Sequence, residues 1–208
     1  MRKTIMGVAA ATALLLAGCG NSEQPAGTDH GNTPPSTGAA EQATHNDADV
    51  TFAQQMVPHH QQALEMAALA ASRGSNDKVK DLANRIKQAQ DPEIQVMNGW
   101  LAQWGVTSTS PPTGMDHGST GTSAPGMDHG AGPGMMAEDE MRQLEQASGA
   151  DFDHMFLEMM IRHHQGAVEE ARTEVAQGAN PDAKALAQRI IDAQQAEIAE
   201  MEGLLKAL

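Results

Sequence analysis

Two pairs of adjacent histidines occur at matching positions in the two halves of the chain. They belong to the motifs Met56-Val-Pro-His59-His60 and Met160-Ile-Arg-His163-His164. On a helix, residues four positions apart share a face, so the methionine and the second histidine of each motif should lie side by side. Imidazole nitrogen and thioether sulfur together suit copper, above all Cu(I). The motifs therefore indicate metal binding.

The motifs lie in an internal repeat of the sequence. Residues 49–104 align with residues 153–208 without a gap, and 23 of the 56 aligned positions are identical. The second part of each repeat adds a glutamate and a methionine four residues apart, which are Glu93 and Met97, and Glu197 and Met201. In a single copy, such methionines are usually core packing, and the histidines are often half-exposed. Their joint recurrence favours the metal-binding interpretation.

Each repeat has the pattern of a helical hairpin, because apolar residues recur every three or four positions on both sides of a glycine. Gly74 and Gly178 are expected to end the first helices, and Asn76 and Asn180 to cap the second helices. Neither hairpin can bury its apolar face alone, so we predict an all-α four-helix bundle. An aromatic content of 2% also disfavours a β-sandwich.

The expected folded domain covers residues 49–208. It comprises a hairpin over 49–104, a Met/His-rich loop over 106–136 and a second hairpin over 137–208, which begins with a short extra helix at about 137–147. Pro58 and Pro92 each remove a helical hydrogen bond. We expect them either to kink the first hairpin or to precede helices that start later in the chain.

Folding each hairpin about its turn should bring its potential ligands to one level. The two layers contain Met56, His59 or His60, Gln90, Glu93 and Met97 in the first hairpin, and Met160, His163 or His164, Gln194, Glu197 and Met201 in the second. Adjacent side chains point about 100° apart on a helix. We therefore expect at most one histidine of each pair to point straight into the core.

The loop between the hairpins repeats a second potential metal-binding motif. Met115-Asp-His117 recurs as Met127-Asp-His129, each between glycines. A flexible string of thioether, carboxylate and imidazole groups could wrap a metal ion without a preformed cavity. Short Met/His tracts are compositional signals only, so drift within a low-complexity linker is the alternative.

The first residues have the features of an export signal. A basic start and a short apolar run occupy residues 1–18, and the Leu-Ala-Gly that precedes Cys19 resembles a bacterial lipobox. We therefore expect Cys19 to be lipidated and to anchor the exported protein to the membrane of the cell envelope. A plain signal peptide with an incidental cysteine is the alternative. Residues 19–48 are rich in small and polar residues and should form a flexible tether.

Composition excludes several other classes of protein. The formal net charge of −14 argues against nucleic-acid binding, which needs a basic surface. The single cysteine excludes an internal disulfide and any CxxC redox or zinc site.

The two His-His motifs, each preceded by Phe-x-x-x-Met starting at Phe52 and Phe156, resemble those of domain of unknown function family 305. The resemblance covers about residues 47–207. It implies a ferritin-like helical bundle, export, and copper binding as in the CopM-type members of the family. The ligands that it implies are Met56, His59, His60, Met97, Met160, His163, His164 and Met201. It does not imply di-iron chemistry, because neither histidine pair has the Glu-x-x-His spacing of those sites.

The favoured function is an extracytoplasmic, lipid-anchored copper-binding protein that sequesters Cu(I) or hands it to a copper-transfer protein, without catalysis. One alternative is a metal-free envelope stress or interaction protein whose acidic surface binds a basic partner. The other is a metallo-oxidoreductase, which is disfavoured by the missing di-iron motif and by the absence of Tyr for radical transfer.

Overall fold

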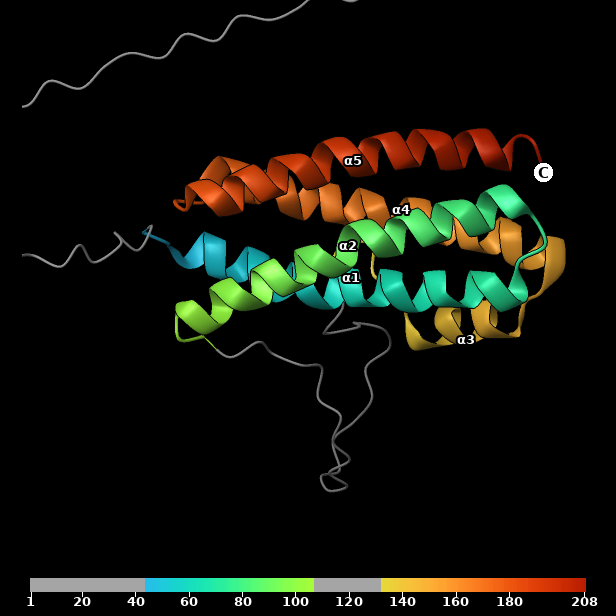
Figure 1. Cartoon of the computed structure of the whole chain (residues 1–208), viewed down its shortest axis with the longest axis horizontal. Coiled ribbons are helices and arrows are strands. Elements are labelled where there is room, and N and C mark those ends of the chain that lie inside the picture. The colour runs from blue at the N-terminus through green and yellow to red at the C-terminus, as the bar shows by residue number, and fades with distance from the viewer. Residues whose placement is uncertain (1–43, 107–131) are drawn as a thin grey trace, which may run out of the picture. The chain divides into compact units, whose positions relative to one another are not determined.

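The computed structural model describes residues 44–106 and 132–208, and these ranges contain five α-helices and no strand (Figure 1). The helices are α1 (Asp47–Arg73), α2 (Asp77–Gln103), α3 (Glu138–Gln146), α4 (Gly149–Gln177) and α5 (Pro181–Leu205). α1 and α2 form one hairpin, α4 and α5 form the other, and α3 is the short extra helix. The predicted all-α bundle is confirmed. None of the described helices is long and apolar enough to cross a lipid bilayer.

The turns of both hairpins have the predicted end residues. Gly74 and Gly178 follow the last residues of α1 and α4, and the side chains of Asn76 and Asn180 accept hydrogen bonds from the first turns of α2 and α5. Both glycines have extended backbone angles, with φ of −70° and −62°, so a left-handed conformation does not explain them. A Cβ atom at Gly74 would lie 2.9 Å from Oδ1 of Asp153. Glycine is needed there because another side chain approaches closely.

The two prolines lie inside continuous helices. α1 begins at Asp47, within the stretch expected to be tether, and runs through Pro58, while α2 runs through Pro92. The expected alternative of helices that start after the prolines is therefore wrong. Proline in a helix interior costs about 3 kcal/mol relative to alanine. Both helices bury an apolar face along their whole length, and this burial offsets that cost.

α1 and α4 form the centre of the bundle and pack against each other, while α2 and α5 each pack against the first helix of their own hairpin. One apolar cluster contains Met66 and Phe156 at one end, and a second cluster contains Phe52 and Ile190 at the other end. The two histidine pairs occupy the stretches of α1 and α4 between these clusters. The bundle therefore holds its four paired histidines in the middle of its length, between the two apolar clusters.

Candidate metal centre

All four histidines of the two pairs are buried in the middle of the bundle. His59, His60, His163 and His164 are each at most 1% exposed. The expectation that only one histidine of each pair points inward is therefore wrong. The reason is that α1 and α4 each have two buried sides, one against the other central helix and one against their own hairpin partner. Side chains about 100° apart reach these two sides separately.

The second histidine of each pair faces the glutamate of its own hairpin. Nε2 of His60 lies 2.8 Å from Oε2 of Glu93, and Nε2 of His164 lies 2.7 Å from Oε2 of Glu197. A carboxylate only accepts, so Nε2 of each ring carries a hydrogen, and in the neutral imidazole Nδ1 then has a free lone pair. The Nδ1 atoms of both rings are buried and have no hydrogen-bond partner.

The two glutamates connect these buried rings to the surface. The side chains of Glu93 and Glu197 are 21% and 16% exposed, whereas the imidazoles that they contact are fully buried. A histidine that donates one ring N–H to a carboxylate and keeps the other nitrogen free is the usual arrangement at protein metal sites. The predicted layers of histidine and glutamate therefore form in both hairpins.

The first histidines of the two pairs meet across the interface between α1 and α4. The ring centroids of His59 and His163 are 3.8 Å apart, at an interplanar angle of 53°. Nε2 of His59 lies 3.0 Å from the carbonyl oxygen of Pro133, its Nδ1 is unpartnered, and neither ring nitrogen of His163 has a hydrogen bond of normal geometry. Burial lowers the pKa of His59 to about 3, and burial and the neighbouring imidazoles lower the pKa of His163 well below its usual value. Both rings are therefore neutral at pH 7, the form that binds metals.

Four thioethers flank the histidines. Met56 and Met97 belong to the apolar cluster on one side, and Met160 and Met201 belong to the cluster on the other side. All four methionines are fully buried. Each hairpin therefore has methionine on both of its helices next to its histidine layer. Gln90 and Gln194, also predicted in these layers, are buried and leave polar atoms without partners.

The donor set favours soft metals over hard ones. Among residues 44–106 and 132–208, no group of three or more His, Cys, Asp or Glu side chains is arranged to hold a metal ion. Zinc and iron sites are normally built from three or four such groups. A metal bound here would therefore need the thioethers to complete its coordination, and thioether sulfur selects Cu(I).

A short return segment, residues 132–137, leads from the loop to α3 and packs against the centre. Gln62 accepts from the backbone N–H of Met136 at 2.7 Å and donates to its carbonyl oxygen at 2.9 Å. A Cβ atom at Gly166 would lie 1.8 Å from the carbonyl oxygen of Pro133, which also faces His59. Glycine at position 166 therefore makes the space that lets this segment reach the histidines. The expected flexible string thus ends in an ordered contact with the site.

Two aspartates that the sequence did not single out hold the hairpins in register. Asp153, near the start of α4, accepts from the backbone N–H groups of Ser75 and Asn76 at 3.1 and 2.8 Å, and also from the Ser75 hydroxyl. These donors belong to the turn of the other hairpin. Asp153 is completely buried, so its charge is satisfied only by this turn.

Asp49, in the first hairpin, makes the corresponding contact with the turn of the second hairpin. It accepts from the backbone N–H groups of Ala179 and Asn180 at 3.1 and 2.8 Å. Burial alone would raise the pKa of Asp49, but hydrogen bonds from the backbone of Asn46, Asn180 and Ala179 and from the side chain of Glu174 lower it. The sequence did contain a signal for these contacts, because Asp49 and Asp153 are identical residues at equivalent positions of the repeat.

The other predicted site residues lie outside the residues that the structure describes. They are Cys19 and the loop residues Met115, His117, Met127 and His129.

The sequence matches one family model, described as domain of unknown function (DUF305), over residues 49–205. No curated protein matches the chain significantly. A solved DUF305 fragment from Deinococcus radiodurans is 32% identical with a TM-score of 0.66, and the match covers 78% of this chain and 98% of the fragment. A "putative secreted protein DUF305" from Streptomyces coelicolor is 30% identical with a TM-score of 0.65, covering 77% of this chain and 93% of that one.

Structures of CopM are also similar to this chain. CopM in the Cu(II)-bound form is 32% identical with a TM-score of 0.60, and the match covers 76% of this chain and 96% of CopM. The Cu(I)-bound form of CopM gives 29% identity and the same TM-score of 0.60, with coverage of 76% and 96%. The likeness therefore covers about three quarters of this chain and nearly all of CopM.

Proposed function

This chain belongs to the DUF305 family, and from that membership and its buried donors we propose that it binds copper as Cu(I) between its two hairpins. The proposed ligands are His59, His60, His163 and His164, with the thioethers of the four methionines that flank them. Glu93 and Glu197 orient the imidazoles. The similarity to copper-bound CopM supports the proposal.

One observation carries the proposal. His60 and His164 each direct Nε2 to a carboxylate and leave Nδ1 buried without a partner. An unpaired buried acceptor costs about 1–3 kcal/mol. The chain has this cost twice, at equivalent positions, and a metal ion would remove it at both. Ordinary core packing supplies no reason for placing these polar atoms among methionines.

In the cell, the proposed role is metal handling rather than catalysis. A Cys19 lipid anchor would keep the protein at the cell envelope, where it would sequester copper or pass it to a copper-transfer protein. The Met-Asp-His motifs of the loop would collect copper ions for the buried centre. Methionine suits this task outside the cytoplasm, because it cannot form disulfides.

Competition titration of the purified protein with Cu(I) and a chromogenic Cu(I) chelator, without oxygen, tests the proposal. The variants His60→Ala and Met97→Leu should each bind Cu(I) at least tenfold more weakly than the wild type. The matched controls are His154→Ala, a histidine with a side chain 55% exposed, and Met66→Leu, a fully buried methionine outside the two layers. Both controls should bind Cu(I) like the wild type.

Circular dichroism of every variant checks that the helical fold is retained. If folded His60→Ala and Met97→Leu bound Cu(I) as tightly as the wild type, the assignment of the site would be wrong. If the wild type bound no copper, the copper-binding function would be refuted and the histidines would have a structural role only.

A further inference from the structure

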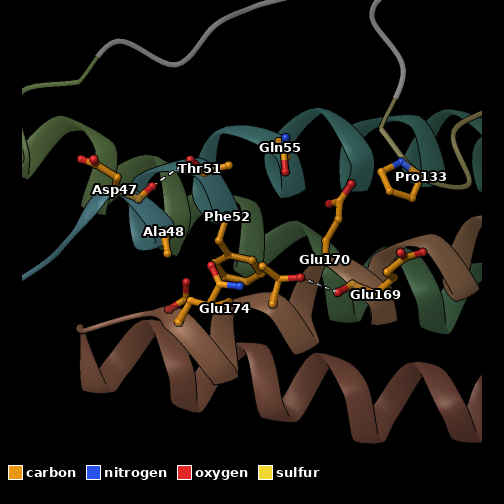
Figure 2. Close-up of a pocket in the computed structure, with 11 residues that line it drawn as sticks. Asp47, Ala48, Thr51, Phe52, Gln55, Pro133, Glu169, Glu170 and Glu174 are labelled. Atoms are coloured by element: carbon orange, nitrogen blue, oxygen red, sulfur yellow. Dashed lines mark hydrogen bonds between the residues drawn. The ribbon is translucent and has the colours of Figure 1, made fainter.

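A second candidate site lies between α1 and α4, on a different set of residues. A groove of about 460 Å³ runs between the first part of α1 and the second half of α4, and Pro133 of the return segment also lines it (Figure 2). Its lining includes Phe52 and Thr51 from α1, and Glu170 and Glu174 from α4. The volume is in the range of small-molecule sites.

Two carboxyl groups in this groove are buried: that of Glu170, which has no hydrogen-bond partner, and that of Glu174, which lies close to the carboxyl group of Asp49. Glu170 and Glu174 are 8% and 1% exposed, and none of their four carboxyl oxygens has a hydrogen bond of normal geometry. Figure 2 shows the Glu170 side chain extending from α4 into the space between the two helices. Buried carboxyl groups normally have partners, but Glu170 has none and Glu174 lies beside another acid, Asp49, so the pair indicates a missing cationic ligand.

The raised pKa values of Glu170 and Glu174 agree with a missing cationic ligand. Burial raises the pKa of Glu170 to about 7, with a further contribution from Glu169. Burial raises the pKa of Glu174 to about 8, and the nearby Asp49 carboxyl adds to this shift. A bound positive charge would favour the ionised form of both carboxyl groups.

The internal repeat provides a direct comparison, because the fold contains an equivalent groove at the other end of α1 and α4. The repeat counterparts of Glu170 and Glu174 are Met66 and Ala70, which are buried in an apolar cluster. Leu144 of α3 belongs to the same cluster, and α3 contacts both α1 and α4. The equivalent groove is therefore filled by a helix.

The wall that faces these positions differs between the two grooves in the same way, because it is polar in the open groove and apolar in the groove filled by α3. Thr51 and Gln55 of α1 line the open groove, and their repeat counterparts are Met155 and Met159, which pack with the apolar cluster under α3. Within the described residues, no helix covers the open groove. Its polar and acidic lining does not suit an amphipathic helix such as α3, but it does suit a small positively charged ligand.

The spacing of Glu170 and Glu174 along α4 indicates which kind of cationic ligand could bind both of them. Residues four apart on a helix have Cβ atoms about 5–6 Å apart, similar to the separation of the nitrogens in a short linear diamine. No third acidic side chain among the described residues completes a metal site with these two. The ring of Phe52 supplies an apolar wall for a methylene chain. We propose that the open groove binds a short linear diamine, with one ammonium group on Glu170 and the other on Glu174.

Isothermal titration of the metal-free protein with 1,4-diaminobutane tests this proposal. The diamine should bind, whereas 1,4-butanediol, a neutral analogue of the same length, should not. Glu170→Gln and Glu174→Gln should each weaken diamine binding at least tenfold, because each removes one negative charge without changing the side-chain shape. Glu65→Gln removes one charge from an exposed position of α1 and is the matched control, with unchanged affinity expected.

A second variant keeps the test decisive if the glutamine variants fold poorly. Glu170→Met introduces the residue that the repeat has at the equivalent position, and it should abolish diamine binding while the fold is retained. Equal diamine affinity in the wild type and in all three groove variants would overturn the proposal. It would also be overturned if the groove bound Mg²⁺, Ca²⁺ or Cu²⁺ but no diamine, or bound nothing.

Discussion

Acidification should destabilise the metal-free protein through His59, and the size of the effect follows from its burial. The pKa of His59 is lowered from 6.5 to about 3 in the folded chain. Its contribution to stability is therefore complete above pH 6.5 and is lost as the pH falls from 6.5 towards 3, because the unfolded chain binds the proton first. At pH 4.5 the loss from His59 alone is about 3 kcal/mol.

Urea unfolding at pH 7.5 and pH 4.5, in the presence of a metal chelator, measures this loss. Glu170 and Glu174 act in the opposite direction, because their raised pKa values make stability fall as the pH rises towards 7 and 8. The wild-type profile therefore combines both effects, and the comparison with His59→Gln isolates the histidine.

On acidification from pH 7.5 to 4.5, His59→Gln should lose about 3 kcal/mol less free energy of unfolding than the wild type. His154→Gln, at a half-exposed position, should behave like the wild type. If His59→Gln and the wild type lost the same free energy within about 0.5 kcal/mol, His59 would not be held neutral by burial. The picture of a neutral imidazole centre would then be refuted.

Three further predictions concern the contacts around the centre. Asp153→Asn should lower the free energy of unfolding in urea by about 2–3 kcal/mol, because the single side-chain oxygen of asparagine cannot accept every hydrogen bond from the facing turn. An unchanged unfolding midpoint would contradict this. Gly166→Ala should cost about 1–3 kcal/mol in thermal unfolding, because its Cβ would lie 1.8 Å from a carbonyl oxygen of the return segment. Gly203→Ala, with no atom within 4 Å of its Cβ, should instead be neutral or stabilising. Glu197→Gln should weaken Cu(I) binding by about 10–100-fold in chelator competition, whereas the exposed Glu202→Gln should not.

The helices and their ends could be predicted from the sequence because local chemistry determines them. Gly74, Asn76, Gly178 and Asn180 end or cap helices in the structure as their residue types suggest. Hairpin geometry also placed Glu93 level with the histidine pair of its hairpin, since a turn of known position determines which residues are level, but it left open that His60 rather than His59 faces the glutamate. These inferences needed no information about how the two hairpins pack together.

Features that depend on contacts between the hairpins were not predictable. The burial of both histidines in each pair requires two buried sides on α1 and on α4, which a single hairpin does not have. The close approach of Pro133 to Gly166 joins positions far apart in the sequence, and no local pattern encodes it. Asp49 and Asp153 did carry a signal in their repeat identity. Aspartate near a helix start is so common that this identity gave no hint of a contact with the other hairpin.

The reciprocal contacts of Asp49 and Asp153 bear on how this chain evolved. Each aspartate caps the turn of the other hairpin, so a single hairpin carrying one such aspartate could make the same contacts with a second copy of itself. A symmetric homodimer of one ancestral hairpin would thus satisfy both sets of bonds. In such a dimer, every substitution appears in both grooves at once. A single chain that contains two copies is free of this constraint, so one groove can be apolar and covered by α3 while the other is acidic and, within the described residues, has no helix over it.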